Sequence, residues 1–233
     1  MKPLLFKYLL GVFVLSMVVA CSETERDNLI TPMELTVEQV EPDSVVVHCL
    51  ALYFKVFNFL KWKTAFDEND SLRKSFGFRS NHIFRKALDT NQVLLMMMVT
   101  DLDKAYAFNT DPEVIAQMSE MGVIGQPAAK ILNAVHFEQK IASQNLILMQ
   151  YEVEDYKTWV KRFEETMLFN SNSGVKALYR LYILDNPNMV SMLMEVSSFE
   201  LAQRLIGSPN NISSMKENGV ISEPIMTFLK FIE

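Results

Sequence analysis

Two histidines set in apolar stretches are the residues of this chain best suited to chemistry. His48 and His82 each stand among hydrophobic residues, and histidine is the natural general acid or base near neutral pH. Asn145 and Tyr179 each follow one of these histidines by 97 residues. His48, His82 and Tyr179 are therefore candidate catalytic residues. The competing interpretation for each histidine is a hydrogen-bonded position in the core or at its rim.

Methionines supply a second group of candidates. Met96 and Met98 lie in the apolar stretch Val93–Val99, where flexible thioethers either fill a core or adapt to an apolar ligand. Two cysteines and three histidines form no CxxC or HExxH pattern, so neither a metal site nor a bound cofactor is predicted. The candidate ligand-binding set is His48, His82, Asn145, Tyr179, Met96 and Met98.

The spacing of 97 residues extends along most of the chain. When residues 45–132 are paired without a gap with residues 142–229, 19 of the 88 pairs are identical, against about five expected by chance. A spacing of this length indicates duplication of a whole domain, because solenoid units repeat every ~20 to 50 residues. The identical pairs include Trp62 with Trp159, Phe66 with Phe163, Gly77 with Gly174 and Pro127 with Pro224.

The two copies have the same predicted order of elements. In the first copy, the β-branched and aromatic run 45–56 predicts a strand. Phe59, Trp62 and Phe66 recur at helical spacing, with the tryptophan packed against the sheet, and the helix stops at Gly77. The remaining predicted elements are strands 78–87 and 93–99, a helix capped by Asp101 whose continuation starts at Pro112 and ends at Gly122, and a last strand 128–135.

This βαββαβ order is that of the ferredoxin-like motif, which places the chain in the α+β class. Val93–Val99 is apolar at every position, and a strand that is apolar on both faces is buried on both. The helices of one copy can cover only one face of its sheet, so the other copy is expected to cover the second face. The sequence therefore predicts two ferredoxin-like repeats, 45–136 and 137–233, packed sheet to sheet as a barrel within one chain. This arrangement requires no higher oligomer.

The turns of the second copy carry a resemblance to a known family. Asp185-Asn186-Pro187-Asn188 precedes the third strand, and Gly219-Val220-Ile221-Ser222-Glu223-Pro224 ends the second helix. This pattern resembles the dimeric α/β-barrel superfamily, which includes the antibiotic-biosynthesis monooxygenase-like and stress-responsive barrel proteins. The resemblance implies the same fold, with paired copies forming one barrel. It also implies, as one candidate activity, a cofactor-independent monooxygenase or cyclase.

The N-terminal segment predicts export and lipid anchoring. An apolar run from Tyr8 to Ala20 follows two lysines, and it is too short to span a bilayer, which takes roughly 20 apolar residues. Val18-Val19-Ala20-Cys21 resembles the bacterial lipobox. That resemblance implies a signal peptide over 1–20, cleavage before Cys21 and acylation of its sulfur, so the membrane is a predicted partner. Ser22, at a position where aspartate retains lipoproteins in the inner membrane, implies the outer membrane as the destination within the envelope.

Charge and cysteine content exclude several classes. Residues 21–44 are polar and acidic and predict a tether. The formal net charge of −6 and the absence of a basic cluster argue against nucleic-acid binding. Once Cys21 is acylated, Cys49 is the only thiol left, so it is expected to be a small buried hydrophobic residue.

These features lead to one functional expectation and two alternatives. The first is an envelope lipoprotein that binds a small, largely apolar molecule between the two sheets, because ligand sites favour apolar cavities with a few polar groups. The second is the monooxygenase- or cyclase-type enzyme that the resemblance implies. The third is a scaffold whose outer helices bind another protein.

Overall fold

The computed structural model describes residues 46–137, 140–166 and 174–232, which belong to one compact unit. The predicted signal peptide, Cys21 and the tether lie outside these residues. No helix in the described part of the chain is long and apolar enough to cross a membrane.

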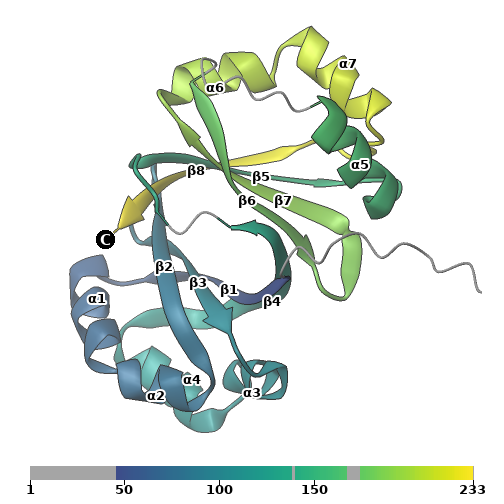
Figure 1. Cartoon of the computed structure of the whole chain (residues 1–233). Coiled ribbons are helices and arrows are strands. Elements are labelled where there is room, and N and C mark those ends of the chain that lie inside the picture. The colour runs from purple at the N-terminus through teal and green to yellow at the C-terminus, as the bar shows by residue number, and fades with distance from the viewer. Residues whose placement is uncertain (1–45, 138–139, 167–173, 233) are drawn as a thin grey trace, which may run out of the picture. The chain divides into compact units, whose positions relative to one another are not determined.

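The first repeat contains four strands and four helices (Figure 1). Asp101 accepts a hydrogen bond from the backbone N–H of Lys104 at 3.1 Å, and Pro112 occupies the first turn of the next helix, as predicted. Gly122 ends that helix with a φ of 87°. The elements are β1 (Val47–Val56), α1 (Phe59–Glu68), α2 (Asp70–Ser75), β2 (Phe78–Lys86), β3 (Gln92–Val99), α3 (Leu102–Phe108), α4 (Pro112–Glu120) and β4 (Val123–Phe137).

The second repeat follows the same order. Trp159 occupies in α5 the place that Trp62 has in α1, and both are 1% exposed. The elements are β5 (Asn145–Glu152), α5 (Tyr156–Thr166), β6 (Val175–Ile183), β7 (Asn186–Val196), α6 (Phe199–Ile206), α7 (Pro209–Glu217) and β8 (Ile225–Ile232).

Most boundaries of the first repeat agree with the prediction to within two residues, and two elements differ more. The first helix is interrupted at Asn69, whose amide donates back to the carbonyl of Ala65 and so ends α1 one residue before α2 begins. Strand β4 begins at Val123 and not at residue 128. Pro127 is unusual within a strand, because proline cannot donate to a sheet. It is accommodated because the pairing of β4 with β1 shifts register beside it, between Tyr53 and Lys55.

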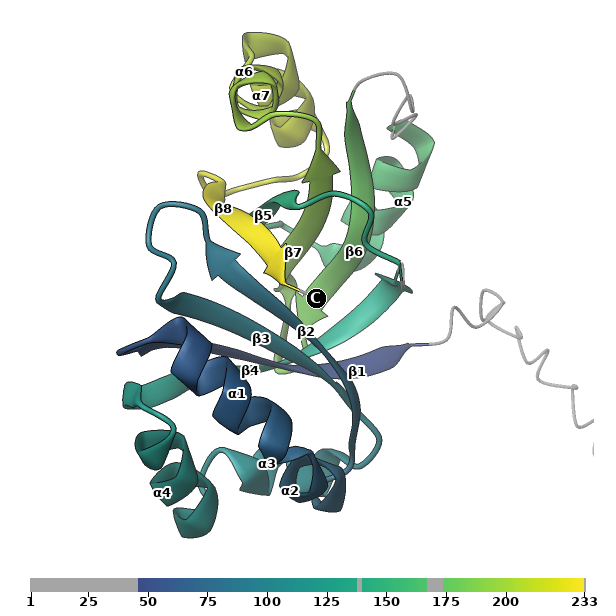
Figure 2. The same ribbon diagram turned by 90° about the vertical axis from the view of Figure 1, so that its left-hand side faces the viewer.

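The eight strands close into one barrel in the order β1-β3-β2-β8-β5-β7-β6-β4. Each repeat supplies four neighbouring strands, and the helices lie outside them (Figures 1 and 2). The two repeats also join edge to edge, because β2 pairs with β8 and β4 pairs with β6. The predicted sheet-to-sheet barrel is confirmed, and its two seams leave neither sheet with an open edge.

The pairing also gives the direction of the internal symmetry. The duplication relates β1 to β5, β2 to β6, β3 to β7 and β4 to β8, which moves every strand four places around the barrel. All neighbouring strands are antiparallel, so a move of four places preserves strand direction. The pseudo-twofold axis therefore runs along the barrel axis. Inward side chains at equivalent positions of the two repeats face each other across it.

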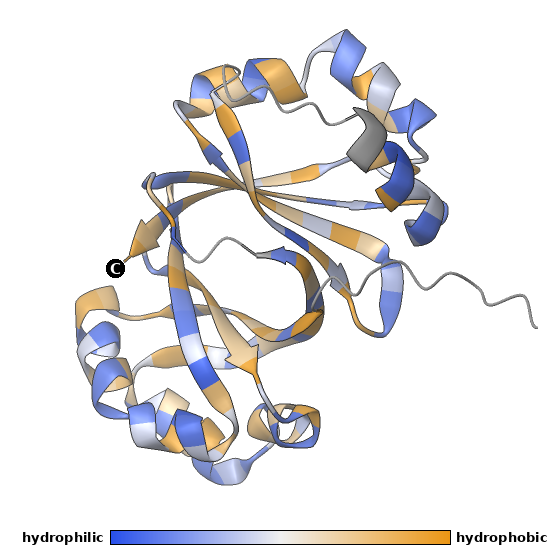
Figure 3. Ribbon diagram, in the orientation of Figure 1, coloured by the Kyte–Doolittle hydropathy of each residue, from blue (hydrophilic) through white to orange (hydrophobic). Residues whose placement is uncertain are grey.

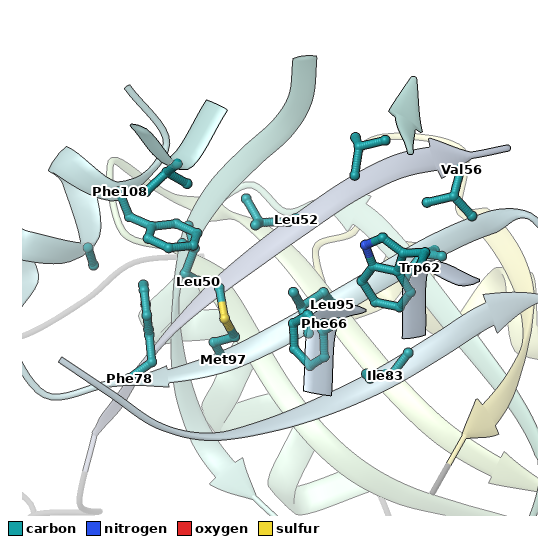
Figure 4. Close-up of a cluster of buried hydrophobic side chains, with 14 of the residues drawn as sticks. Leu50, Leu52, Val56, Trp62, Phe66, Phe78, Ile83, Leu95, Met97 and Phe108 are labelled. Atoms are coloured by element: carbon teal, nitrogen blue, oxygen red, sulfur yellow. The ribbon is translucent and has the colours of Figure 1, made fainter. Parts of the chain in front are cut away.

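Alternation along the strands creates three cores. Outward side chains of the first sheet, such as Leu50 and Leu52, pack with Trp62 and Phe66 beneath the helices (Figure 4). The second repeat has an equivalent core around Trp159. The barrel interior is the third core and combines side chains from both repeats, including Ala51, Phe84, Leu148 and Leu193. The helices interleave hydrophilic and hydrophobic residues, as expected for elements that cover a sheet on one side (Figure 3).

Candidate functional site

His82 and Tyr179 meet inside the barrel. They occupy equivalent positions of the two repeats, and the Tyr179 hydroxyl is hydrogen-bonded to His82 Nδ1. Their rings are stacked with an interplanar angle of 5° and a centroid separation of 5.9 Å. Tyr179 is fully buried and His82 half-buried. We call these two residues the axial pair, because equivalent inward positions meet on the pseudo-twofold axis.

Two further aromatic rings contact the histidine of the axial pair. The rings of Phe84 and Phe231 contact His82 edge-on, at centroid distances of 6.3 Å and 5.7 Å. Burial among these groups lowers the pKa of His82, because desolvation penalises the charged imidazolium. The axial pair is therefore set up as a neutral hydrogen-bonded pair, and which atom donates depends on the imidazole tautomer.

His48 and Asn145 lie on the opposite face of the sheet from the axial pair. His48 follows the alternation of Leu50 and Leu52, which face the helices, whereas Cys49 faces the interior. The expectation that His48 and Asn145 line the space between the sheets is therefore wrong. Each pairs with the equivalent residue of a last strand: His48 Nδ1 lies 2.7 Å from Asn133 Oδ1, and Lys230 donates to Asn145 Oδ1.

Met96 and Met98 lie on the inward face of β3, but neither lines the mouth cleft described below, and the sequence prediction that they bind a ligand stays a prediction. Met96 is 4% exposed within the interior core, and Met98 shares its face and is half-buried. Cys49 is buried in the same core, and desolvation raises the pKa of its thiol to about 12, so it is an inert hydrophobic residue. Among the described residues, no group of three or more His, Cys, Asp or Glu side chains is arranged to hold a metal ion.

A cleft of about 340 Å³ opens at one end of the barrel. We call it the mouth cleft. Its inner wall consists of the inward side chains Leu94, Leu148 and Leu229, together with Tyr53 and Gln150. Its other lining residues are Phe54, Lys55, Lys86, Gln92, Val93 and Thr227, from the ends of β1, β2, β3 and β8 that gather there.

Tyr53 and Gln150 are the polar groups inside the mouth cleft, and sequence reasoning missed them. Burial raises the pKa of Tyr53 to about 12, and a hydrogen bond with the Gln150 side chain opposes this rise. Gln150 Nε2 also donates to Ser191 Oγ at 3.2 Å. Tyr53 and Gln150 are equivalent positions of the repeats, as are His82 and Tyr179. Both repeats have a polar residue at this equivalent position of an otherwise apolar strand, and this pattern in the sequence could have identified them.

The space between sheet and helices offers much less room. In the first repeat it contains a void of about 30 Å³, lined by side chains that include Trp62, Phe66 and Leu95. A void of that size holds about one water molecule. The two tryptophans therefore act as core residues, as predicted, and the mouth cleft is the better candidate for a ligand.

Comparison with known proteins supports the fold alone. No protein-family model matches the chain, and no curated protein sequence matches it significantly. Among solved structures, a provisionally assigned monooxygenase from Lactobacillus acidophilus aligns with a TM-score of 0.53 at 12% identity, covering 80% of this chain and 93% of its own. A provisionally assigned chlorite dismutase aligns with a TM-score of 0.53 at 10% identity, covering 81% and 95%. An anthrone oxidase-like protein aligns with a TM-score of 0.51 at 10% identity, covering 80% and 92%. The chain thus shares the dimeric α/β-barrel fold with these proteins.

Proposed function

We propose that this chain, a dimeric α/β barrel made within one polypeptide, is a lipid-anchored envelope protein that binds a small, largely apolar molecule in the mouth cleft. The observation that carries the binding proposal is the cleft itself. Its volume of about 340 Å³ lies within the range of small-molecule sites, roughly 300–1,000 Å³. Three leucines offer apolar contact, and Tyr53 and Gln150 offer one hydroxyl and one amide to orient a polar group on the ligand.

Exposed apolar side chains near the cleft support this proposal. Phe57 and Leu60 are 76% and 74% exposed just beyond the end of β1, and Leu88 is 97% exposed in the turn between β2 and β3. Asn91, in the same turn, accepts a hydrogen bond from the backbone N–H of Phe59, so this turn lies beside the start of α1. Phe57 and Leu88 each follow a cleft-lining residue, Lys55 and Lys86, by two positions, so they add apolar surface beside the strand ends that form the cleft.

Catalysis has weaker support than binding. The monooxygenase or cyclase alternative would use His82 as the general base, as its half-buried position on the barrel axis allows. Neither His82 nor Tyr179 lines the mouth cleft or the void under the helices. Binding therefore remains the function we propose.

Replacing Thr227 with tryptophan should weaken ligand binding at least ten-fold. Thr227 is half-buried at the mouth of the cleft, opposite Leu148, so an indole there would occupy the space. The measurement is a fluorescence titration with N-phenyl-1-naphthylamine, a neutral apolar probe. The matched control is Ser213→Trp, on the exposed face of α7. Equal probe affinity in wild type and Thr227→Trp, with both folded, would rule out the mouth cleft as the site.

The lipid anchor is tested separately at Cys21. The lipobox-like segment before it supports acylation in the bacterial envelope. Metabolic labelling with a clickable palmitate analogue should mark the full chain and should fail for Cys21→Ser. Cys49→Ala is the matched control, because it removes the only other cysteine and should leave labelling intact. Labelling that persists in Cys21→Ser would remove the anchor from the proposal.

A further inference from the structure

The outer face of the β2–β8 seam places two cations side by side. Arg85 and Lys230 are direct partners across this seam. Like charges that face each other across antiparallel strands destabilise the pair. None of the ion pairs within the described residues includes either of them. The seam therefore concentrates positive charge on a chain whose formal net charge is −6.

Both cations are held in place by neutral groups. The Arg85 guanidinium stacks 3.9 Å from the centroid of the Phe59 ring, and its Nε donates to the carbonyl of Thr90. Lys230 Nζ donates to Asn145 Oδ1 and lies 5.1 Å from the Phe199 ring centroid. Rings and amide oxygens orient the two side chains without cancelling their charge. This leaves the remaining N–H donors of a half-buried Arg85 and Lys230 for a further partner.

A groove of about 420 Å³ lies at these two residues. We call it the seam groove. Arg85, Lys230 and the exposed Gln144 amide bring donors to it, whereas Ile232, which packs against the outer core, brings apolar surface. Thr90 and Phe231 complete its lining.

The other seam provides an internal comparison. The positions equivalent to Arg85 and Lys230 are Tyr182 and Asn133, which face each other across the β4–β6 seam and carry no charge. The duplicated fold therefore does not need a cation pair at this place. The cation pair is present at the β2–β8 seam and absent from the equivalent place in the β4–β6 seam. The repulsion between the two cations destabilises the fold, so their presence requires an explanation other than the fold.

We propose that the seam groove is an anion site that takes the carboxylate or phosphate group of a small molecule. The planar guanidinium of Arg85 can donate two parallel hydrogen bonds to such a group, and Lys230 supplies a second charge. A bound oxyanion relieves the repulsion between the two cations. This site is separate from the mouth cleft, because the two share no lining residue.

The test is a calorimetric titration of residues 41–233 with inorganic phosphate and with benzoate, at constant ionic strength set by sodium chloride. Those residues contain the closed barrel and all three cores. We expect saturable binding of at least one of the two anions, with affinity at least ten-fold lower in Arg85→Gln and in Lys230→Gln. The matched control is Lys161→Gln, which removes one exposed charge from α5 and should bind as wild type does.

Thermal unfolding provides a second, independent measurement of the same site. Without phosphate, Lys230→Gln should unfold at the same temperature as wild type or higher, because it removes a like-charge pair. With the anion that binds in the titration, wild type should gain more in melting temperature than this variant does. An equal gain in both proteins, or the absence of saturable binding of either anion to wild type, would overturn the proposal. Benzoate binding without phosphate binding would assign the groove to carboxylates.

Discussion

Truncation of Phe84 to alanine should lower the free energy of unfolding of both repeats together, by about 3–5 kcal/mol. Phe84 is fully buried in the barrel interior, where it packs with Leu181 and Leu193 of the second repeat in one core. Its ring centroid lies 5.8 Å from that of Phe231. The cavity left by the ring would belong to both sheets at once. The two repeats should therefore unfold in one transition, although each has its own core beneath its helices.

The chain provides a reporter for each repeat. It contains two tryptophans, Trp62 in the first repeat and Trp159 in the second. Denaturant unfolding of the single-tryptophan variants Trp159→Phe and Trp62→Phe, each with and without Phe84→Ala, would follow the repeats separately by fluorescence. We expect Phe84→Ala to lower the free energy of unfolding by the same amount, whichever tryptophan reports it. Leu60→Ala is the control, because Leu60 is 74% exposed and its truncation should change stability by less than about 0.5 kcal/mol. A Trp159 midpoint that does not move would show that the repeats unfold independently.

Removal of the Tyr179 hydroxyl should cost about 0.5–1.5 kcal/mol of stability, the net contribution of a typical intramolecular hydrogen bond. The Tyr179→Phe variant retains the ring stacked on His82 and removes the hydrogen bond to its Nδ1. In a double-mutant cycle with His82→Leu, the coupling free energy should be about 0.5–3 kcal/mol and stabilising. A coupling free energy near zero would mean that the two side chains contribute to stability independently and that their hydrogen bond adds nothing.

The same pair predicts how stability depends on pH. Burial lowers the pKa of His82 below its ordinary value of 6.5, so the unfolded chain binds the proton first as pH falls. Neutral His82 makes its full contribution to the free energy of unfolding at pH values above its pKa in the unfolded chain. That contribution is lost as the pH falls toward the lower pKa of His82 in the folded chain. Each proton taken up on unfolding changes stability by about 1.4 kcal/mol per pH unit. Between about pH 5.5 and 7.5, one unit on each side of that unfolded pKa, the free energy of unfolding should therefore depend less on pH in His82→Leu than in wild type.

Local sequence patterns were sufficient for most of the fold. The duplication, the order of elements and the caps at Asp101 and Pro112 all depend on residues close together in the chain, and the structure confirms them. The apolar run of β3 correctly indicated a strand buried on both faces, which required a second sheet. The break at Asn69 and the early start of β4 at Val123 were missed, because they depend on a side-chain hydrogen bond and on a register shift in the partner strand.

The candidate site was predictable only in part, and His48 shows why. Alternation along a strand places His48 with Leu50 and Leu52, and His82 with Phe84, on common faces of their strands. Both faces of these strands are rich in apolar residues, so periodicity contains no information on which face turns inward. Lys230 and Arg85 could not be paired from sequence either, because 145 residues separate them and only the β2–β8 seam brings them together.

The amino-acid sequence alone determined that this protein has two copies of one domain, because identical residues recur at a constant spacing. It also determined the strands and helices and the two faces of each strand, because these features depend on residues close together in the chain. Closure of the barrel settled the rest. Pairing at the two seams turned the face of His82 inward and the face of His48 outward. Because the pseudo-twofold axis coincides with the barrel axis, His82 meets Tyr179 and Tyr53 meets Gln150, contacts that depend on how the sheets join and not on any local pattern.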